Sequence, residues 1–162
     1  MDADRVIRDQ LLDLLRGGNA HMSFDDAVSG FPLEAVNTHV PHSSYMVWHL
    51  LVHMRIVQWD ILEFVRNPNH ISPDFPAGYW PRSDETGTPE IWEQTVRDIR
   101  KDLKDLEGIV QDPNVDFFGP IPHAKKYTIF REILLVADHN AFHVGELVAV
   151  RRVLNLNPVK EY

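Results

Sequence analysis

The stretch LLVADHNAFHVGELV, Leu134–Val148, carries the pattern that decides the fold class. Apolar residues recur along it at intervals of three and four, which predicts a buried helix. Two histidines, His139 and His143, lie four residues apart in the middle of this apolar run. A polar side chain buried without a partner costs on the order of several kcal/mol. We therefore expect these two imidazoles to have partners inside the protein.

Similar helical patterns recur along the 162-residue chain and are joined by proline-rich connections. Long helices are expected at residues 4–16, from 43 or 44 to 66, at 89–111 and at 129–154. Thr88 and Thr128 are the expected N-caps of the last two, and a short helix is expected after Ser23. The loops at 67–87 and 112–127 show no alternating pattern, so no strand is expected there. The sequence predicts one all-α domain over residues 1–162, a four-helix bundle with two long proline-rich loops.

The second long helix repeats the unusual feature of the fourth. His49 and His53 are again four residues apart, and Asp60 falls within about 20° of them on a helical wheel. The opposite side of this helix is expected to face solvent and carries Arg55, Gln58 and Arg66. If the two histidine-bearing faces meet, three or four imidazoles converge.

Convergent imidazoles and carboxylates suit a divalent transition metal, because neutral imidazole is a ligand that zinc, nickel, copper and iron all accept. Glu132 and Glu146 fall on the same stripe of the fourth helix as its two histidines, seven residues either side of His139. For one histidine pair alone, satisfied core or surface histidines are the simpler interpretation; two pairs together favour a metal site. Asn140 follows His139 where the zinc-protease motif has glutamate, and the Glu-x-x-His pairs of di-iron bundles are missing.

Composition excludes several classes of function. The net charge of −8 argues against a nucleic-acid partner, which needs a basic face. The chain has no cysteine, so disulfides and thiolate ligands are ruled out. The longest unbroken apolar run, Ile133–Ala137, is far below the roughly 20 residues of a membrane span. The N-terminus lacks a signal-peptide pattern, so a soluble cytoplasmic protein is expected.

Four stretches of the chain resemble the DinB/YfiT-like family of bacterial four-helix bundles, which are metal-dependent proteins. HNAFHVGEL is similar to that family's motif in the fourth helix, and VWHLLVHMRIVQWDILEF is similar to its second helix. GYWP and TIFREILLVADH match a subgroup of the family in order and spacing. The similarity extends from about Val6 to Leu154.

The resemblance implies a site in which three histidines hold one divalent metal ion, with zinc or nickel as the expected metal. Carried over position by position, the ligands are His53, His139 and His143. His49 falls where the family varies, and the wheel geometry leaves it open as a fourth ligand or as a partner of the ligands. Three imidazoles with an open fourth position are typical of catalytic zinc sites.

The resemblance also implies a homodimer and a metal-dependent thiol S-transferase or hydrolase that acts on a small molecule, with a low-molecular-weight thiol as co-substrate. Glu146 is the candidate catalytic residue, as general base, fourth ligand or hydrogen-bond partner, and it stands where the family has glutamine. Phe142 stands where tyrosine is common. Candidates for the dimer surface are Leu11, Leu14, Leu15 and Trp92. The alternative is a non-catalytic bundle, metal-stabilised or oligomerising, that acts as a stress-related binding protein.

Overall fold

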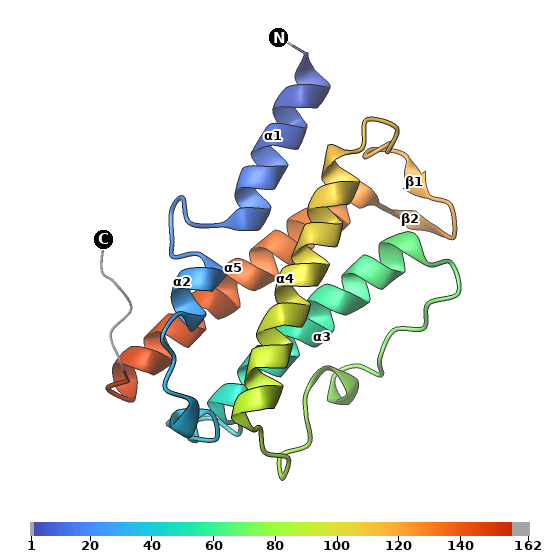
Figure 1. The fold of residues 1–162 in the computed structure, drawn as a ribbon. Helices are drawn as coiled ribbons and strands as arrows, with labels where there is room; N and C mark the ends of the chain where they lie inside the picture. The colour runs from blue at the N-terminus through green and yellow to red at the C-terminus, as the bar shows by residue number, and fades with distance from the viewer. Residues whose placement is uncertain (1, 157–162) are drawn as a thin grey trace.

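A computed structural model describes residues 2–156 of the chain, and these residues are mostly helical (Figure 1). The helices are α1 (Ala3–Arg16), α2 (Phe24–Val28), α3 (Val47–Arg66), α4 (Pro89–Gln111) and α5 (Ile129–Val153). Two 3-10 turns lie in the connections, η1 (Leu33–Ala35) and η2 (Ala77–Tyr79). A two-stranded antiparallel hairpin, β1 (Pro120–Ile121) and β2 (Ala124–Thr128), precedes α5.

Side-chain caps set where the helices begin. Thr88 accepts a hydrogen bond from the amide of Ile91 at 3.3 Å, and Thr128 accepts one from the amide of Arg131 at 3.2 Å. Ser23 forms a capping box at the start of α2. Each cap satisfies an amide that has no partner inside its helix. The three predicted N-caps are therefore confirmed.

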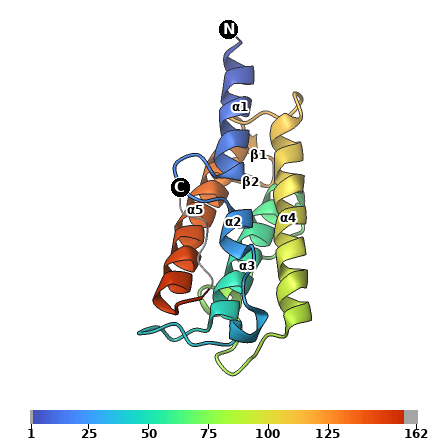
Figure 2. The ribbon, with the colours of Figure 1, turned by 60° about the vertical axis from the view of Figure 1, so that its left-hand side comes forward.

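Helix α3 occupies the centre of the molecule and packs against α4 on one side and α5 on the other (Figure 2). Helix α1 packs across α4 and α5, and α2 packs on α5. One apolar cluster fills the space between α3, α4 and α5, around Leu50, Leu51 and Leu147. A second cluster joins α1 to the other ends of these helices, around Leu11 and Leu106.

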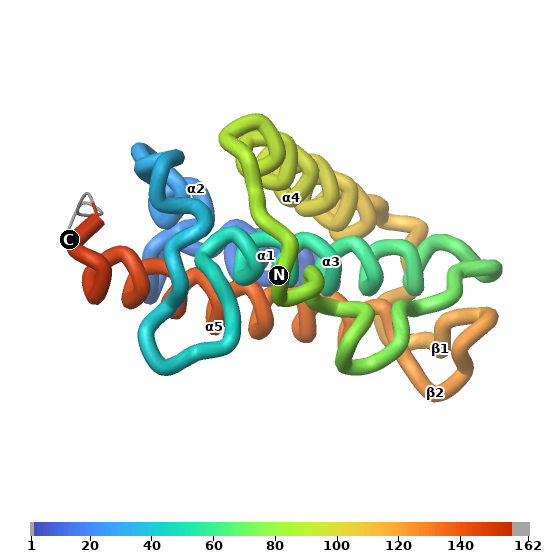
Figure 3. The backbone as a smooth tube through the Cα atoms, turned by 90° about the horizontal axis from the view of Figure 1, so that it is seen from below, coloured from blue at the N-terminus to red at the C-terminus, as the bar shows by residue number. Residues whose placement is uncertain are grey.

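The connection from α3 to α4 runs back along α3 (Figure 3). Three hydrogen bonds record its path, because His70 contacts Asp60, the Tyr79 carbonyl contacts His53, and the Glu85 carbonyl contacts His49. Later residues of the loop thus contact earlier residues of α3, so the loop runs antiparallel to the helix. The loop at 67–87 is long because it must return along a 20-residue helix, which is about 30 Å in length.

Two expectations for the second long helix were wrong. Helix α3 begins at Val47 rather than at residue 43 or 44, because the Ser43 hydroxyl bonds to the carbonyls of Val40 and Tyr45 and holds a turn there. Gln58 does not face solvent. Its exposed fraction is 1%, and its amide bridges α4 and α5 by donating to the Ile99 carbonyl and accepting from Asn140.

The expectation that no strand lies in the segment 112–127 was also wrong. The β1–β2 hairpin is short, and no residue of β2 is buried, so the sequence carries no alternation of apolar and polar positions. Ile121 is only 1% exposed, and its burial anchors the hairpin to the protein. The hairpin is therefore determined by its packing on the rest of the protein and not by a local sequence pattern.

The surface expected to form a dimer is largely internal. Leu11, Leu15 and Trp92 are 3–4% exposed and belong to the apolar clusters of the chain itself. Leu14 alone of the four is exposed, at 47%. The apolar side chains of α1 therefore pack against α4 and α5 of the same chain, and most of this surface is not available to a second copy.

One window of helix α5 is long and apolar enough, by length and composition alone, to cross a membrane. Of that window, 44% is buried inside the protein, against α3, α1 and α2. A core helix of a soluble protein passes the same test, and α5 carries buried Glu132 and His143.

Candidate metal centre

Three histidines converge between α3 and α5. His53 comes from α3, and His139 and His143 come from successive turns of α5. One ring nitrogen from each lies within 4.8 Å of the other two, and the Nε2 atoms of His53 and His139 are 3.2 Å apart. His53 and His143 are buried and His139 is half-buried. Among the described residues, this is the group of three imidazoles or carboxylates that could hold a metal ion.

Hydrogen bonds decide which nitrogen of two rings carries the proton. Nδ1 of His53 lies 2.8 Å from the carbonyl oxygen of Tyr79, which can only accept. Nδ1 of His143 lies 2.7 Å from the carboxylate of Glu146, which accepts in the same way. Both rings therefore carry their proton on Nδ1 and leave Nε2 with a free lone pair. Outer partners of this kind orient histidine ligands in metal sites.

One pair of nitrogens in the cluster has the spacing of two ligands on one metal ion. Two nitrogens bound to one tetrahedral zinc ion at about 2.05 Å lie about 3.3 Å apart, close to the 3.2 Å between His53 and His139. The other nitrogen of His139, Nδ1, is buried and makes no hydrogen bond of normal geometry, although the Asn140 side chain lies near it. A buried imidazole without such a bond is costly unless its ring has another partner.

Burial keeps two of the three candidate ligands, His53 and His139, neutral. Burial lowers the pKa of His53, and burial with the neighbouring imidazoles lowers the pKa of His139 to about 3. Neutral imidazole is the form that binds a metal, because the lone pair must be free. His53 and His139 are therefore in their ligand form at neutral pH.

Glu146 connects the histidines to the segment before α3. One oxygen accepts from His143, and the other accepts a hydrogen bond from the hydroxyl of Tyr45. The bond from His143 lowers the pKa of the Glu146 carboxyl, and the Tyr45 bond acts in the same direction against the effect of burial. Burial and the contact with Glu146 raise the pKa of Tyr45 to about 12. Glu146 is thus a carboxylate and Tyr45 a neutral hydroxyl.

The loop at 67–87 supplies two groups that sequence reasoning missed. The Trp80 ring stacks on His53, with ring centroids 3.9 Å apart and an interplanar angle of 4°. Tyr79 contributes its carbonyl to His53 and its hydroxyl to Asp60. The sequence marked this loop by its prolines and aromatic residues, but nothing in it indicated which residue would reach the histidines.

His49 is placed apart from the cluster. Its Nδ1 accepts from the Met46 amide at 3.3 Å, and its Nε2 donates to the Glu85 carbonyl at 2.8 Å. Both ring nitrogens are therefore used by the backbone. His49 caps the start of α3 and holds the end of the long loop, and it offers no lone pair to an ion.

The remaining acidic side chains of the two stripes also lie outside the cluster. Asp60 accepts from His70 and from the Tyr79 hydroxyl, both at 2.7 Å. Glu132 is 2% exposed and accepts from Arg131 at 2.7 Å. On a helical wheel Asp60 and Glu132 share a face with the histidines. Along the helix axis, however, each lies seven residues, or about two turns, from His53 or His139.

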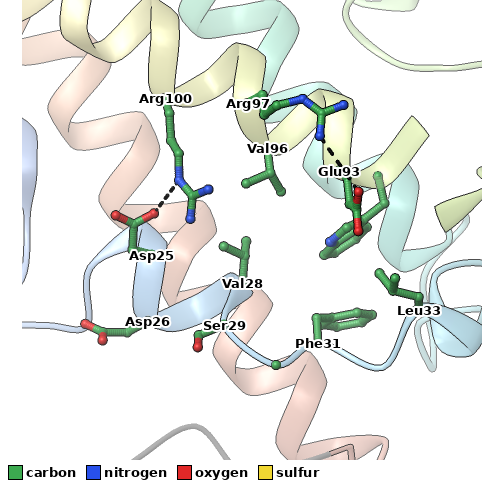
Figure 4. A pocket seen from close by; sticks show the side chains of 12 residues that line it. Asp25, Asp26, Val28, Ser29, Phe31, Leu33, Glu93, Val96, Arg97 and Arg100 are labelled. Atoms are coloured by element: carbon green, nitrogen blue, oxygen red, sulfur yellow. Dashed lines mark hydrogen bonds and ion pairs between the residues drawn. The ribbon is translucent and has the colours of Figure 1, made fainter. Parts of the chain in front are cut away.

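Two cavities are relevant to a site. One of about 460 Å³ is lined by Ser44, Tyr45, His49, Trp80, Pro81 and Ser83. None of the three cluster histidines lines it, but Trp80 stacks on His53 and Tyr45 donates a hydrogen bond to Glu146. Another of about 770 Å³ lies between α2 and α4 (Figure 4). It is floored by the stacked rings of Phe31 and Trp92 and bordered by the Asp25–Arg100 ion pair, and no histidine lines it. Only the first cavity shares residues with the metal-site network.

Comparison of the chain with models of protein families, with curated proteins and with solved structures finds no match. The site is therefore interpreted from its own geometry.

Proposed function

We propose that this protein binds one divalent metal ion, zinc or nickel, through His53, His139 and His143. The observation that carries the proposal is the convergence of three imidazoles, two of which are held in the tautomer that aims Nε2 into the cluster. The described helices fit a four-helix bundle formed by α1, α3, α4 and α5. Together with the motifs of α3 and α5, they support membership of the DinB/YfiT-like family.

We further propose that the site is catalytic, as a thiol S-transferase or hydrolase in a soluble, cytoplasmic protein. When bound, an ion held by three imidazoles supplies a Lewis acid that lowers the pKa of a coordinated water or thiol. The cavity beside Trp80 and Tyr45 gives a small-molecule substrate a place next to the cluster. The sole carboxylate bonded to a ligand histidine among the described residues is Glu146, and Tyr45 places a neutral hydroxyl on it.

Each of these side chains has a defined task. The Tyr79 carbonyl and Glu146 hold the Nδ1 protons of His53 and His143, so that the lone pairs stay aimed at the same point. The Trp80 ring covers one face of His53 and keeps water from it. Tyr45 lines the cavity with a hydroxyl whose pKa of about 12 keeps it a donor at neutral pH.

Metal analysis of untagged protein tests the binding proposal. We expect about one zinc or nickel ion per chain, and we expect His53→Ala to abolish binding at micromolar metal. His123→Ala is the matched control, because His123 is exposed and its one hydrogen bond within residues 2–156 is to the carbonyl of Phe64. Equal loss in both variants would contradict the assignment of ligands.

Turnover is tested separately from binding. The loaded protein is incubated with a low-molecular-weight thiol and an electrophile, and thiol consumption is followed with His53→Ala as the blank. Metal binding without turnover of any thiol or ester would support the alternative, a metal-stabilised binding protein. If the protein neither binds a metal nor turns over a substrate, it is a helical protein whose histidines have a structural role.

A further inference from the structure

The cavity between α2 and α4, which we call the α2–α4 cavity, shares no residue with the metal-site network. Its volume of about 770 Å³ is within the range of small-molecule sites, roughly 300–1,000 Å³. Its middle is apolar, because Val28 of α2 and Val96 of α4 face each other there and Phe31 lies beside them (Figure 4). The proposed metal chemistry makes no use of this cavity.

One side of α4 carries the groups that give the cavity its polarity. Trp92, Val96 and Arg100 all line it and follow one another at intervals of four residues. Residues at this spacing lie on the same side of a helix. The first and the last are eight residues apart, which is about 12 Å along the helix axis. The cavity therefore has an apolar middle with a different polar group at each end.

At the Trp92 end, the polar group without a partner is a donor. Trp92 is 3% exposed, and its ring stacks on Phe31 with ring centroids 4.4 Å apart. Its indole N–H makes no hydrogen bond with any residue from 2 to 156. Unlike the nitrogen of Trp48, it is not sealed inside the core, so it is accessible from the cavity that Trp92 lines. An N–H group in such a place is stabilised by an acceptor, and a ligand can supply one.

At the other end, Arg100 offers a guanidinium group. Its Nε donates to Asp25 of α2 at 2.7 Å, and this bond holds the guanidinium between α2 and α4. Its two Nη nitrogens make no hydrogen bond with the described residues 2–156. Figure 4 shows them turned toward Val28 and Val96. Two parallel N–H groups of this kind match the two oxygens of a carboxylate.

The acidic side chains around the cavity leave this end open to an anion. Asp25 and Glu93 are 67% and 59% exposed, so water reaches both carboxylates. Each also lies beside an arginine, Asp25 beside Arg100 and Glu93 at 3.8 Å from Arg97. Asp26 belongs to the capping box of α2 and points away from the cavity in Figure 4. A cationic ligand would lie against two guanidinium groups, whereas a carboxylate would be attracted by them.

We propose that the α2–α4 cavity binds a small, elongated apolar carboxylate that carries an uncharged oxygen acceptor at its far end, such as an oxo acid or a hydroxy acid. The carboxylate pairs with the Nη nitrogens of Arg100. The apolar chain lies along Val96 and Val28, and the far oxygen accepts the N–H of Trp92. This site does not depend on the metal, so its test and the metal test can fail independently.

Nitrogen–proton NMR of the purified chain shows where a ligand binds. The four tryptophans give four indole signals, and the signal missing from Trp92→Phe belongs to Trp92. Titration with 7-oxooctanoate is expected to shift this signal to higher proton frequency, because its N–H gains an acceptor, and to move the other three much less. The same shift is expected in His53→Ala, which separates this site from the histidine cluster.

Probes that differ only at their ends separate the two polar groups. By isothermal titration, 7-oxooctanoate is expected to bind most tightly. Octanoate lacks the oxo group and should bind about 3- to 10-fold more weakly, the usual effect of one neutral hydrogen bond. Octan-2-one lacks the carboxylate and should lose about 10-fold or more, as for a hydrogen bond to a charged group. Octylammonium, the cationic counterpart, should bind most weakly.

Two variants assign each end to its residue. Arg100→Met should lower the affinity for both carboxylates about 10-fold or more and leave that for octan-2-one unchanged. Trp92→Phe keeps an aromatic ring but removes the N–H, so it should lower the affinity for 7-oxooctanoate to that for octanoate and leave octanoate unchanged. Arg16→Met is the first control, because Arg16 makes a similarly exposed ion pair between helices with Glu107. Trp48→Phe is the second, since Trp48 belongs to the same apolar cluster but does not line the cavity.

Several results would overturn the proposal. These are a Trp92 indole signal that 7-oxooctanoate leaves in place, octan-2-one or octylammonium binding as tightly as 7-oxooctanoate, and equal losses in Arg100→Met and Arg16→Met. A Trp92→Phe variant that loses as much affinity for octanoate as for 7-oxooctanoate would show that the N–H group has no part in binding. Thermal unfolding reports whether each variant is folded, and if Trp92→Phe is not, Arg100→Met with the four probes decides.

Discussion

Glu146 is the residue whose role most affects the chemistry of the site. Both of its oxygens are engaged, one by the Nδ1 proton of His143 and the other by the Tyr45 hydroxyl. A carboxylate in this position raises the basicity of its histidine and fixes the direction of the Nε2 lone pair. We therefore expect Glu146 to act on the metal through His143.

Glu146→Ala is expected to weaken metal affinity about 10- to 100-fold, the usual effect of removing such a partner. Glu146→Gln should weaken it less, because the amide oxygen can still accept from His143. Isothermal titration with zinc measures both, with Glu93→Ala on the exposed face of α4 as the control. The nitrogen chemical shifts of His143 report whether its proton stays on Nδ1.

A different pattern would assign Glu146 another role. If affinity is unchanged in Glu146→Gln but turnover falls about 100-fold or more, the carboxylate is a general base. If neither quantity changes in Glu146→Ala, the hydrogen bond to His143 has no functional consequence, and the positioning role is wrong.

At the level of elements, the loop at 67–87 is held in place along its whole length. Near its end, Gly87 exchanges two hydrogen bonds of 2.8 Å with the Asn37 side chain. Its backbone lies against the Trp48 indole, so that a Cβ there would be 2.6 Å from the ring. These contacts, together with His49 to Glu85 and His53 to Tyr79, make the loop a fixed part of the site.

Gly87→Ala is expected to lower the free energy of unfolding by about 1–3 kcal/mol, because the added methyl group overpacks the contact with Trp48. The melting temperature should then fall by about 2–4 °C for each kcal/mol. Gly108→Ala makes the same chemical change in open space within a helix and should stabilise by about 0.5–1 kcal/mol. Melting curves that shift equally in the two variants would contradict the close approach.

For the whole molecule, a metal between α3 and α5 would link two helices that are distant in the sequence. A ligand that binds only the folded state at 100 times its dissociation constant adds about 2.7 kcal/mol of stability. For a chain of 162 residues this corresponds to about 5–11 °C in melting temperature.

Chelation by EDTA is therefore expected to lower the melting temperature of the metal-loaded protein by about 5–11 °C. Added zinc should restore it, and the melting temperature of His53→Ala should respond to neither treatment. His123→Ala should respond like the wild type, since in the described part of the chain His123 bonds to the Phe64 carbonyl and to no metal-site residue. A wild-type melting curve that EDTA and zinc leave unchanged would show that no metal stabilises the fold.

Sequence patterns were sufficient for features that depend on neighbours along the chain. Periodicity predicted the long helices, and cap residues predicted where α4 and α5 begin. The spacing of four placed His139 and His143 on one face of α5. These features follow from backbone hydrogen bonding and side-chain direction within a few residues, which are written in the local sequence.

Tertiary structure alone decided which side chains meet. His49 and His53 are equivalent by spacing, and the resemblance rather than the wheel favoured His53; the structure brings His53 to α5 and gives His49 to the backbone. The Tyr79 carbonyl and the Trp80 ring reach His53 only because the loop at 67–87 runs back along α3 before α4 begins. Such contacts depend on the path of a long connection and on the packing of distant elements, and a local pattern of residues contains neither.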